Sequence, residues 1–163
     1  AVTVGGALGE AICAVADCKG LEHRLELFAT LDGVRWFNDS ISTIPEAAIN
    51  AVEGIGDVKT LILGGMDRGV PYGELEKYIA SGKVENVILS YGSGKRILDE
   101  ISPLEPKCNI YEAADIYEAA DRAKNITKSG SVLFSPAAAS YGYFKNFEDR
   151  GSKFKEYVLK GTK

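Results

Sequence analysis

The fold of this chain is decided by the stretch Ser135–Gly151, which reads SPAAASYGYFKNFEDRG. The residues just before it, Ser131–Phe134, form a short apolar run that predicts a buried strand. Apolar residues and glycine then recur at spacings of three and four, which predicts one face of a helix: Phe144, Phe147, Gly151, Phe154 and Val158. In an open α/β sheet, such a strand, loop and helix place the loop hydroxyls and the free helix N–H groups at the carboxyl edge, where ligands bind. The helix dipole favours an anion there.

The same alternation runs through the rest of the chain. Two β-rich runs, 25–31 and 34–39, are separated by Asp32-Gly33, which is the strongest short-range signal for a hairpin with a type I′ turn. Short apolar runs and amphipathic helical patterns follow in turn, with strands expected at 60–63, 87–89 and 109–111 and helices around 45–55, 75–79, 97–101 and 116–126. We therefore expect an α/β fold with a Rossmann-like, mostly parallel sheet, helices on both faces and an N-terminal β-hairpin.

Composition excludes several classes of function. The 163 residues carry a net charge of −4, and the 19 Lys and Arg are scattered, which argues against a nucleic-acid partner. No apolar run approaches the length of a membrane span, and the first residues lack the basic region of a signal peptide. Three cysteines at irregular spacing and a single His favour reduced thiols and no metal site. We expect a cytoplasmic monomer.

Four motifs stand in a fixed order: LEHR at 21–24, NDSIST at 38–43, GGMDRG at 64–69, and SPAAAS with FKNFEDRG at 135–151. Together they resemble the bacterial Mur ligases, and most closely the branch that adds D-glutamate. The resemblance implies that residues 21–163 are the C-terminal domain of such a ligase. Residues 1–20, which carry a small-residue helical pattern, are then expected to be the remnant of a preceding central ATPase domain or its linker.

The resemblance implies a set of residues that bind D-glutamate, namely Thr43, Arg68, Ser140, Tyr141 and Phe147. A guanidinium can grip a carboxylate with two parallel bonds, and hydroxyls supply further donors. The residues by themselves also allow simpler structural roles. Ser140 could cap the last helix and Phe147 could be core, Arg68 could be a solvated residue in a βα turn, and Thr43 could form a capping box with Glu46.

The resemblance further assigns Arg24 and Asp39 to the nucleotide, with Arg24 reaching the ATP phosphates on a neighbouring domain. Ile41 stands where many members carry Lys, which fits the variant of this loop that reads DSISTxP, here with Ile44 between Thr43 and Pro45. For His23 we expect a partly buried side chain with a local hydrogen bond. Gly92-Ser93-Gly94-Lys95 lacks the spacing of a Walker A loop, so we interpret it as a βα turn.

The function implied is that of an ADP-forming amide ligase of peptidoglycan synthesis, and thus of cell-wall biogenesis. ATP, with Mg²⁺, would phosphorylate the carboxylate of UDP-N-acetylmuramoyl-L-alanine, and the amine of D-glutamate would attack the acyl phosphate. The phosphate-binding loop and metal ligands of this family lie upstream, so no catalytic residue is expected in this fragment and the fragment alone should be inactive. Two alternatives stay open: another Mur or folylpolyglutamate-type ligase, and a stand-alone Rossmann-like binding module.

Overall fold

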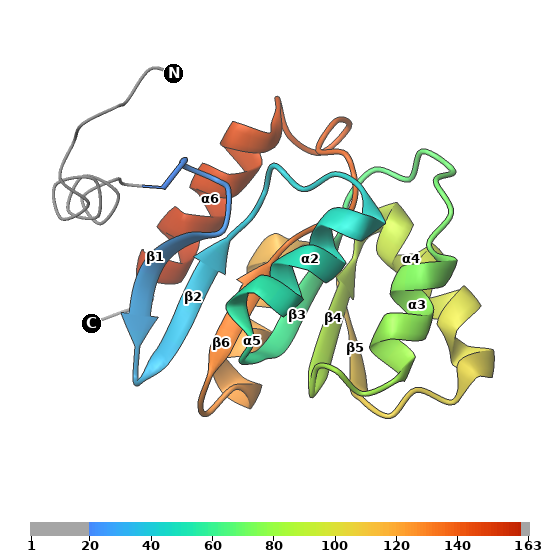
Figure 1. The fold of residues 1–163 in the computed structure, drawn as a ribbon. Coiled ribbons are helices and arrows are strands. Elements are labelled where there is room, and N and C mark those ends of the chain that lie inside the picture. Colours follow the sequence, from blue (N-terminus) through green and yellow to red (C-terminus); the bar gives the residue numbers. More distant parts are fainter. Residues whose placement is uncertain (1–19, 161–163) are drawn as a thin grey trace, which may run out of the picture.

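A six-stranded sheet organises the computed structural model, which describes residues 20–160 (Figure 1). The strands are β1 Glu26–Leu31, β2 Val34–Asn38, β3 Val58–Gly64, β4 Asn86–Ser90, β5 Asn109–Ala113 and β6 Ser131–Phe134. Their order across the sheet is β1-β2-β6-β3-β4-β5, with β1 antiparallel to β2 and the other neighbours parallel. The expected mostly parallel sheet with an N-terminal hairpin is confirmed. The helix expected in residues 1–20 lies outside the described residues, apart from Gly20.

The hairpin turn follows from its two central residues. Asp32 has φ of 51° and Gly33 has φ of 81°, so both lie in the left-handed region that a type I′ turn requires. Leu31 pairs with Val34 across this two-residue turn. The prediction made from Asp-Gly is therefore confirmed.

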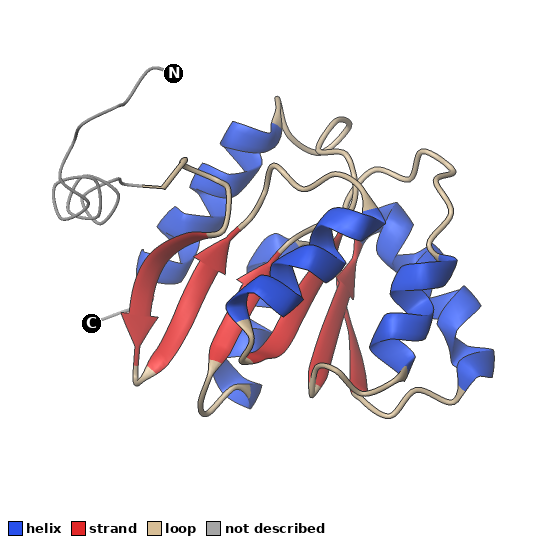
Figure 2. Cartoon of the chain, in the orientation of Figure 1, coloured by secondary structure: helices blue, strands red, loops and turns tan. Residues whose placement is uncertain are grey.

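Helices cover both faces of the sheet (Figure 2). They are α2 Pro45–Ile55, α3 Gly73–Ala80, α4 Tyr91–Ile101, the short 3-10 helix η1 Ser102–Leu104, α5 Ile116–Ile126 and α6 Phe147–Lys160. Within β3, Leu61 and Leu63 pack into the cluster that contains α2, α3 and α4, whereas Ile62 packs into the cluster of α5 and α6. Both faces of the strand are thus buried, as its continuous apolar sequence predicts. None of the helices described between residues 20 and 160 is long and apolar enough to cross a bilayer.

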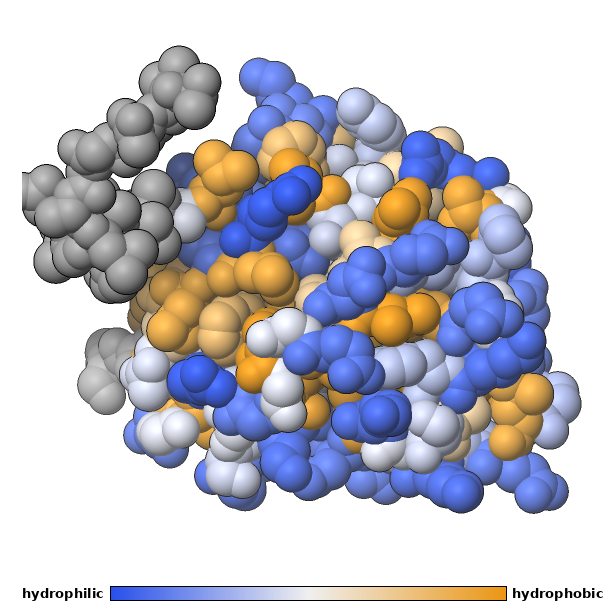
Figure 3. Space-filling model, in the orientation of Figure 1, coloured by the Kyte–Doolittle hydropathy of each residue, from blue (hydrophilic) through white to orange (hydrophobic). Residues whose placement is uncertain are grey.

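One part of the sheet is less covered. Figure 3 shows apolar side chains gathered beside α2, over the end of the sheet formed by β1 and β2. Leu25 and Leu27 are 40% and 52% exposed there. An apolar face of this kind is typical of a surface that another protein segment covers.

Three local predictions were wrong. The N-cap of α2 is Ile44 without a side-chain bond, so Thr43 and Glu46 form no capping box, although Pro45 does occupy the first turn. Gly92–Lys95 do not form a turn but belong to the first turns of α4. Gly94 packs closely against the Leu89 backbone there, since a Cβ on Gly94 would lie only 2.9 Å from the Leu89 carbonyl carbon. The last helix begins at Phe147, so it does not include Phe144 and Ser140 does not cap it.

Glu76 on α3 provides a test of pH dependence. Burial, reinforced by the nearby carboxyl of Glu100, raises its pKa from 4.5 to about 7, and its Oε1 has no hydrogen-bond partner. At a pH between these two pKa values, Glu76 is protonated in the folded state and ionised in the unfolded state. The free energy of unfolding therefore falls as the pH rises from about 4.5 to about 7. We expect the free energy of unfolding to fall by about 2 kcal/mol between pH 5 and pH 8, because each pKa unit corresponds to ~1.4 kcal/mol and Glu100 is partly solvated.

The measurement is urea unfolding of this chain at both pH values, for the wild type and for Glu76→Gln. The variant should lose most of the pH dependence and be the more stable protein at pH 8. Glu74→Gln, on the exposed side of the same helix, should leave the dependence unchanged. Equal pH profiles for the wild type and Glu76→Gln would contradict the assignment.

Candidate functional site

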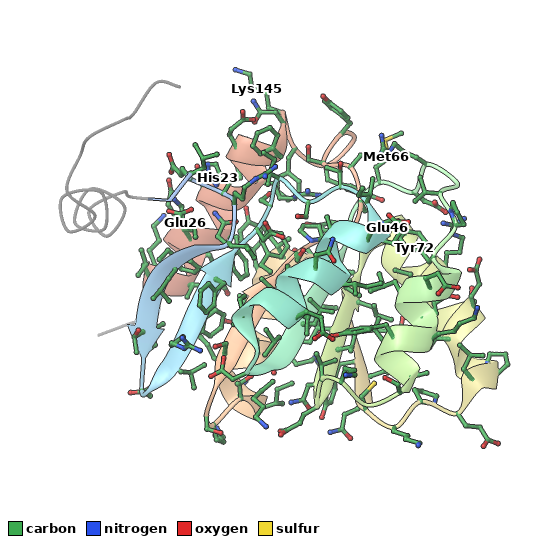
Figure 4. The ribbon with its side chains drawn as sticks, in the orientation of Figure 1. His23, Glu26, Glu46, Met66, Tyr72 and Lys145 are labelled. Carbon is green, nitrogen blue, oxygen red and sulfur yellow. The ribbon has the colours of Figure 1, made fainter. Side chains whose placement is uncertain are left out.

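The candidate site lies where the parallel strands end, at the neighbouring strands β3 and β6. The chain leaves β3 toward α3 on one face and leaves β6 toward α6 on the other. The loops after these strands begin at the carboxyl edge of the sheet, which is the usual ligand position in an open α/β sheet. Figure 4 shows His23, Met66 and Lys145, from three different loops, along this edge.

Two backbone bonds join the loops after β3 and β6. Gly64 N–H donates to Pro136 O at 2.9 Å, and Met66 N–H donates to Ala139 O at 2.8 Å. Such close approach requires glycine, since a Cβ at Gly65 would lie 2.5 Å from Ala139 O. The paired glycines of the GGMDRG motif thus bring the loop with Arg68 against the loop with Ser140.

Asp39 ties a third loop, the one after β2, to the same edge. Its Oδ2 accepts hydrogen bonds from Ser42 Oγ at 2.5 Å and Ser135 Oγ at 2.7 Å, and its Oδ1 accepts from Leu25 N–H at 3.2 Å. Burial raises the pKa of this carboxyl, against the opposing effect of these hydrogen bonds and of the Arg24 charge. Both oxygens of Asp39 are therefore engaged in holding loops together.

Arg24 lies beside Asp39, the other residue that the resemblance assigns to the nucleotide. Both line a pocket of about 250 Å³ together with Ser42 and Asn50. Among the described residues, the Arg24 guanidinium makes no hydrogen bond or ion pair, and the residue is exposed. An unpaired cation over a small pocket can bind phosphate oxygens, whereas a whole nucleotide needs a larger site.

The five residues expected to bind D-glutamate come from all three loops. Arg68 is exposed, and its Nη2 donates to the backbone oxygen of Thr43 at 3.2 Å, so these two are in contact. Ser140 is buried, but its hydroxyl makes no hydrogen bond among residues 20–160. Tyr141 is 63% exposed and touches none of the others through a hydrogen bond or ring contact within the described part of the chain. Phe147 is half-buried, and its carbonyl accepts from Ser40 Oγ at 2.8 Å.

His23 is hydrogen-bonded as expected, but it is fully rather than partly buried, and the partner of its ring is Asn38, 15 positions away, rather than a local residue. Its Nδ1 accepts from Asn38 Nδ2 at 2.8 Å, because the Oδ1 of Asn38 already accepts from the Ser40 N–H. A Cβ on Gly151 would lie 2.4 Å from the same Nδ1. Gly151 in α6 therefore lets the His23–Arg24 segment pack closely against that helix.

Arg150 is a central residue that the sequence analysis missed. It is fully buried, with Nε donating to Ser40 Oγ at 3.0 Å, Nη1 to Ala138 O at 3.0 Å and Nη2 to Ser40 O at 2.8 Å. It has no carboxylate partner among the described residues, and burial lowers its pKa to about 10. Its burial could have been predicted from its position on the apolar stripe of α6, next to Gly151. A charged residue at such a position needs hydrogen-bond partners inside the protein. One side chain thus joins the loop after β2, the loop after β6 and α6.

Comparison with known proteins identifies close relatives. No protein-family model matches the chain. It is 41% identical over 142 residues to the UDP-N-acetylmuramoylalanine–D-glutamate ligase of Pelotomaculum thermopropionicum, covering 86% of this chain and 31% of that protein. The enzymes of the same name from Roseiflexus sp. and Pelodictyon phaeoclathratiforme are 40% and 36% identical, over 89% and 97% of this chain and 32% and 34% of theirs. The chain thus spans about a third of the length of these relatives.

Solved structures share the fold. The UDP-N-acetylmuramate–alanine ligase of Thermotoga maritima matches with a TM-score of 0.64 at 18% identity, over 97% of this chain and 35% of that one. The MurF ligase of Thermotoga maritima, solved in complex with ADP, matches with a TM-score of 0.62 at 19% identity, over 93% and 34%. These identities and this fold show that the chain belongs to the Mur ligase family, in the group of the UDP-N-acetylmuramoylalanine–D-glutamate ligases, and has the fold of a C-terminal domain of that family.

Proposed function

We propose that this chain is the domain that binds D-glutamate in an ADP-forming amide ligase of peptidoglycan synthesis, which joins D-glutamate to UDP-N-acetylmuramoyl-L-alanine. The observation that carries the proposal is the meeting of three motif loops at one edge of the sheet. There the exposed Arg68 contacts Thr43, and the loop of Arg68 is bonded to the loop of Ser140. The names of the relatives support the same substrate.

The residues of this edge suit a dicarboxylic amino acid. The Arg68 guanidinium supplies a cation with paired donors for one carboxylate, and the free hydroxyl of Ser140 supplies a further donor. Thr43 adds a hydroxyl, and the Phe147 ring adds an apolar wall beside the aliphatic carbons. None of these four residues carries a negative charge that would pair with the amine of D-glutamate, so the amine stays available as the nucleophile.

The nucleotide is proposed to be bound mainly by another part of the protein. ATP would supply the phosphoryl group that activates the carboxylate of the UDP-linked substrate. Arg24 fits this group, since its guanidinium is free and lines a pocket that suits a phosphate. Asp39 is a weaker fit for direct Mg²⁺ ligation, because both its oxygens already accept hydrogen bonds. We therefore propose that Asp39 holds the loop below Arg24, and that Mg²⁺ is bound elsewhere.

The function is tested with the complete reading frame that contains this chain. Phosphate release should require ATP, UDP-N-acetylmuramoyl-L-alanine and D-glutamate together. Efficient turnover with a different amino acid, and none with D-glutamate, would sink the proposal. The 163-residue chain alone should release no phosphate under the same conditions, because its sequence contains no phosphate-binding loop of the G-x4-GK-[ST] type.

Arg68→Ala in the complete enzyme should raise the KM for D-glutamate by about 10- to 100-fold, since a hydrogen-bonded charge pair contributes ~1.5–3 kcal/mol. The KM for ATP should stay within about twofold, because the substitution removes a contact to one substrate only. Steady-state kinetics with each substrate varied in turn provide the measurement. A matched control is Lys128→Ala, an exposed cation between α5 and β6, away from this edge. An unchanged KM for D-glutamate would remove Arg68 from the site.

A further inference from the structure

The first turns of α4 have no role in the function proposed above, yet they contact the loop after β3 closely. Ser93 N–H donates to Gly65 O at 3.1 Å, and Gly65 N–H donates to Ser93 Oγ at 2.9 Å. The backbone of the GGMDRG motif is therefore fixed to α4 at its beginning. The GSGK sequence, which is not a Walker A loop, thus lies in a helix that holds this loop in place.

Arg96, one turn further along α4, fixes the rest of that loop. Its Nη2 donates to Val70 O, and its Nε lies 3.2 Å from Asp67 Oδ2. Its guanidinium also lies over the Tyr72 ring, 4.7 Å from the ring centre. Arg96 thus contacts Asp67, just before Arg68 in the sequence, and Val70, two residues after it.

Asp67 transmits this restraint to the turn itself. Its Oδ1 accepts from the Gly69 N–H at 2.9 Å, while its Oδ2 faces Arg96. Gly69 has φ of 72°, so the turn requires this left-handed residue immediately after Arg68. Arg96, Asp67 and Gly69 together determine the direction in which the backbone presents Arg68.

We propose that Arg96 is a positioning residue for D-glutamate, which acts through Asp67 and Val70 on the loop that carries Arg68. This inference rests on the function proposed above. Arg96 does not bind substrate in this arrangement, because its Nη2 donates to the Val70 carbonyl and its charge pairs with Asp67. Its contribution is to hold the exposed Arg68 ready for the carboxylate, so that less conformational freedom is lost when the substrate binds.

The contact of Arg96 with Asp67 also explains why the GGMDRG motif can carry an acidic residue directly before Arg68. A loop with two adjacent charged residues, Asp67 and Arg68, could fold back so that the two pair with each other. Arg96 engages the carboxylate of Asp67 and leaves the Arg68 guanidinium exposed, with its one bond to the Thr43 carbonyl. The carboxyl of Glu100, 3.8 Å from Arg96, completes the charge balance on α4.

The test uses the complete enzyme with Arg96→Ala and the matched control Lys95→Ala, an exposed cation on the same turn. Arg96→Ala should raise the KM for D-glutamate about tenfold and change kcat and the KM for ATP by less than about twofold. Arg96→Lys keeps the charge that faces Asp67, so it should recover about half of this loss on a logarithmic scale. Lys95→Ala should match the wild type. Equal KM values for Arg96→Ala and Lys95→Ala would overturn the proposal.

A double-mutant cycle separates positioning from general destabilisation. If Arg96 acts through Arg68, Arg96→Ala should raise the KM for D-glutamate by less than about twofold when Arg68 is already alanine. Multiplicative losses in the double variant would overturn the inference while leaving the proposed function intact. A wild-type enzyme that does not use D-glutamate would instead overturn the proposed function, and it would show this before any variant is measured.

Discussion

Arg150→Ala is expected to lower the free energy of unfolding of this chain by about 4 kcal/mol. The guanidinium makes three hydrogen bonds inside the protein, each worth ~1.5–3 kcal/mol for a charged donor. Burial of the charge offsets part of this gain by about 3 kcal/mol, because it lowers the pKa of Arg150 from 12.5 to about 10. Alanine also leaves a cavity beneath the loops, which adds ~1–2 kcal/mol to the loss.

Urea unfolding of wild type and variant at pH 7 measures this difference. The control is Lys153→Ala on the same helix, whose ammonium forms a half-exposed pair with Asp149 and should contribute less than about 1 kcal/mol. Arg150→Met should fall between them, since it refills most of the volume and removes the buried charge but leaves the Ser40 and Ala138 carbonyls without a donor. A loss below 1 kcal/mol for Arg150→Ala would show that the three contacts do not hold the loops.

Arg24→Ala in the complete ligase is expected to reduce kcat by about 10³-fold, while the KM for D-glutamate changes little. Arginine side chains that stabilise charge on a transferring phosphoryl group contribute ~10³–10⁵ in kcat. Arg24 is the candidate for this role because its guanidinium is unpaired among residues 20–160 and lines the small pocket next to Asp39. The stability of the chain should be nearly unchanged, since Arg24 is exposed and its side chain makes no hydrogen bond or ion pair with residues 20–160.

Single-turnover rates of acyl-phosphate formation, compared with steady-state rates, locate the defect in the phosphoryl step. Arg35→Ala is a suitable control, because Arg35 lies at the opposite end of β2 and pairs there with Asp57. Arg24→Lys retains a charge but not the planar fork, so its kcat should lie between those of the wild type and Arg24→Ala. Normal turnover by Arg24→Ala would place the phosphate contact on another residue.

Local sequence patterns determined the elements of this protein. Asp32-Gly33 predicted the hairpin because a type I′ turn needs two residues that tolerate positive φ, and both adopt it. The apolar run around Leu61 predicted a strand buried on both faces, and the structure buries it so. The order of the four motifs also predicted the family. These features depend on residues close together in the chain, which is why they can be predicted from it.

Tertiary structure alone decided which of these elements meet. The insertion of β6 between β2 and β3 brings Ser135 to Asp39, 96 positions away in the sequence, and no periodicity encodes that order. The sequence analysis gave Arg150 within FKNFEDRG no role, yet the residue is fully buried and bonds to two carbonyls and a hydroxyl from distant loops. The GSGK sequence resembled a turn, but close packing of Gly94 on Leu89 draws it into α4. The chemistry of each residue is set by the sequence, whereas its partners depend on long-range contacts that form only in the folded chain.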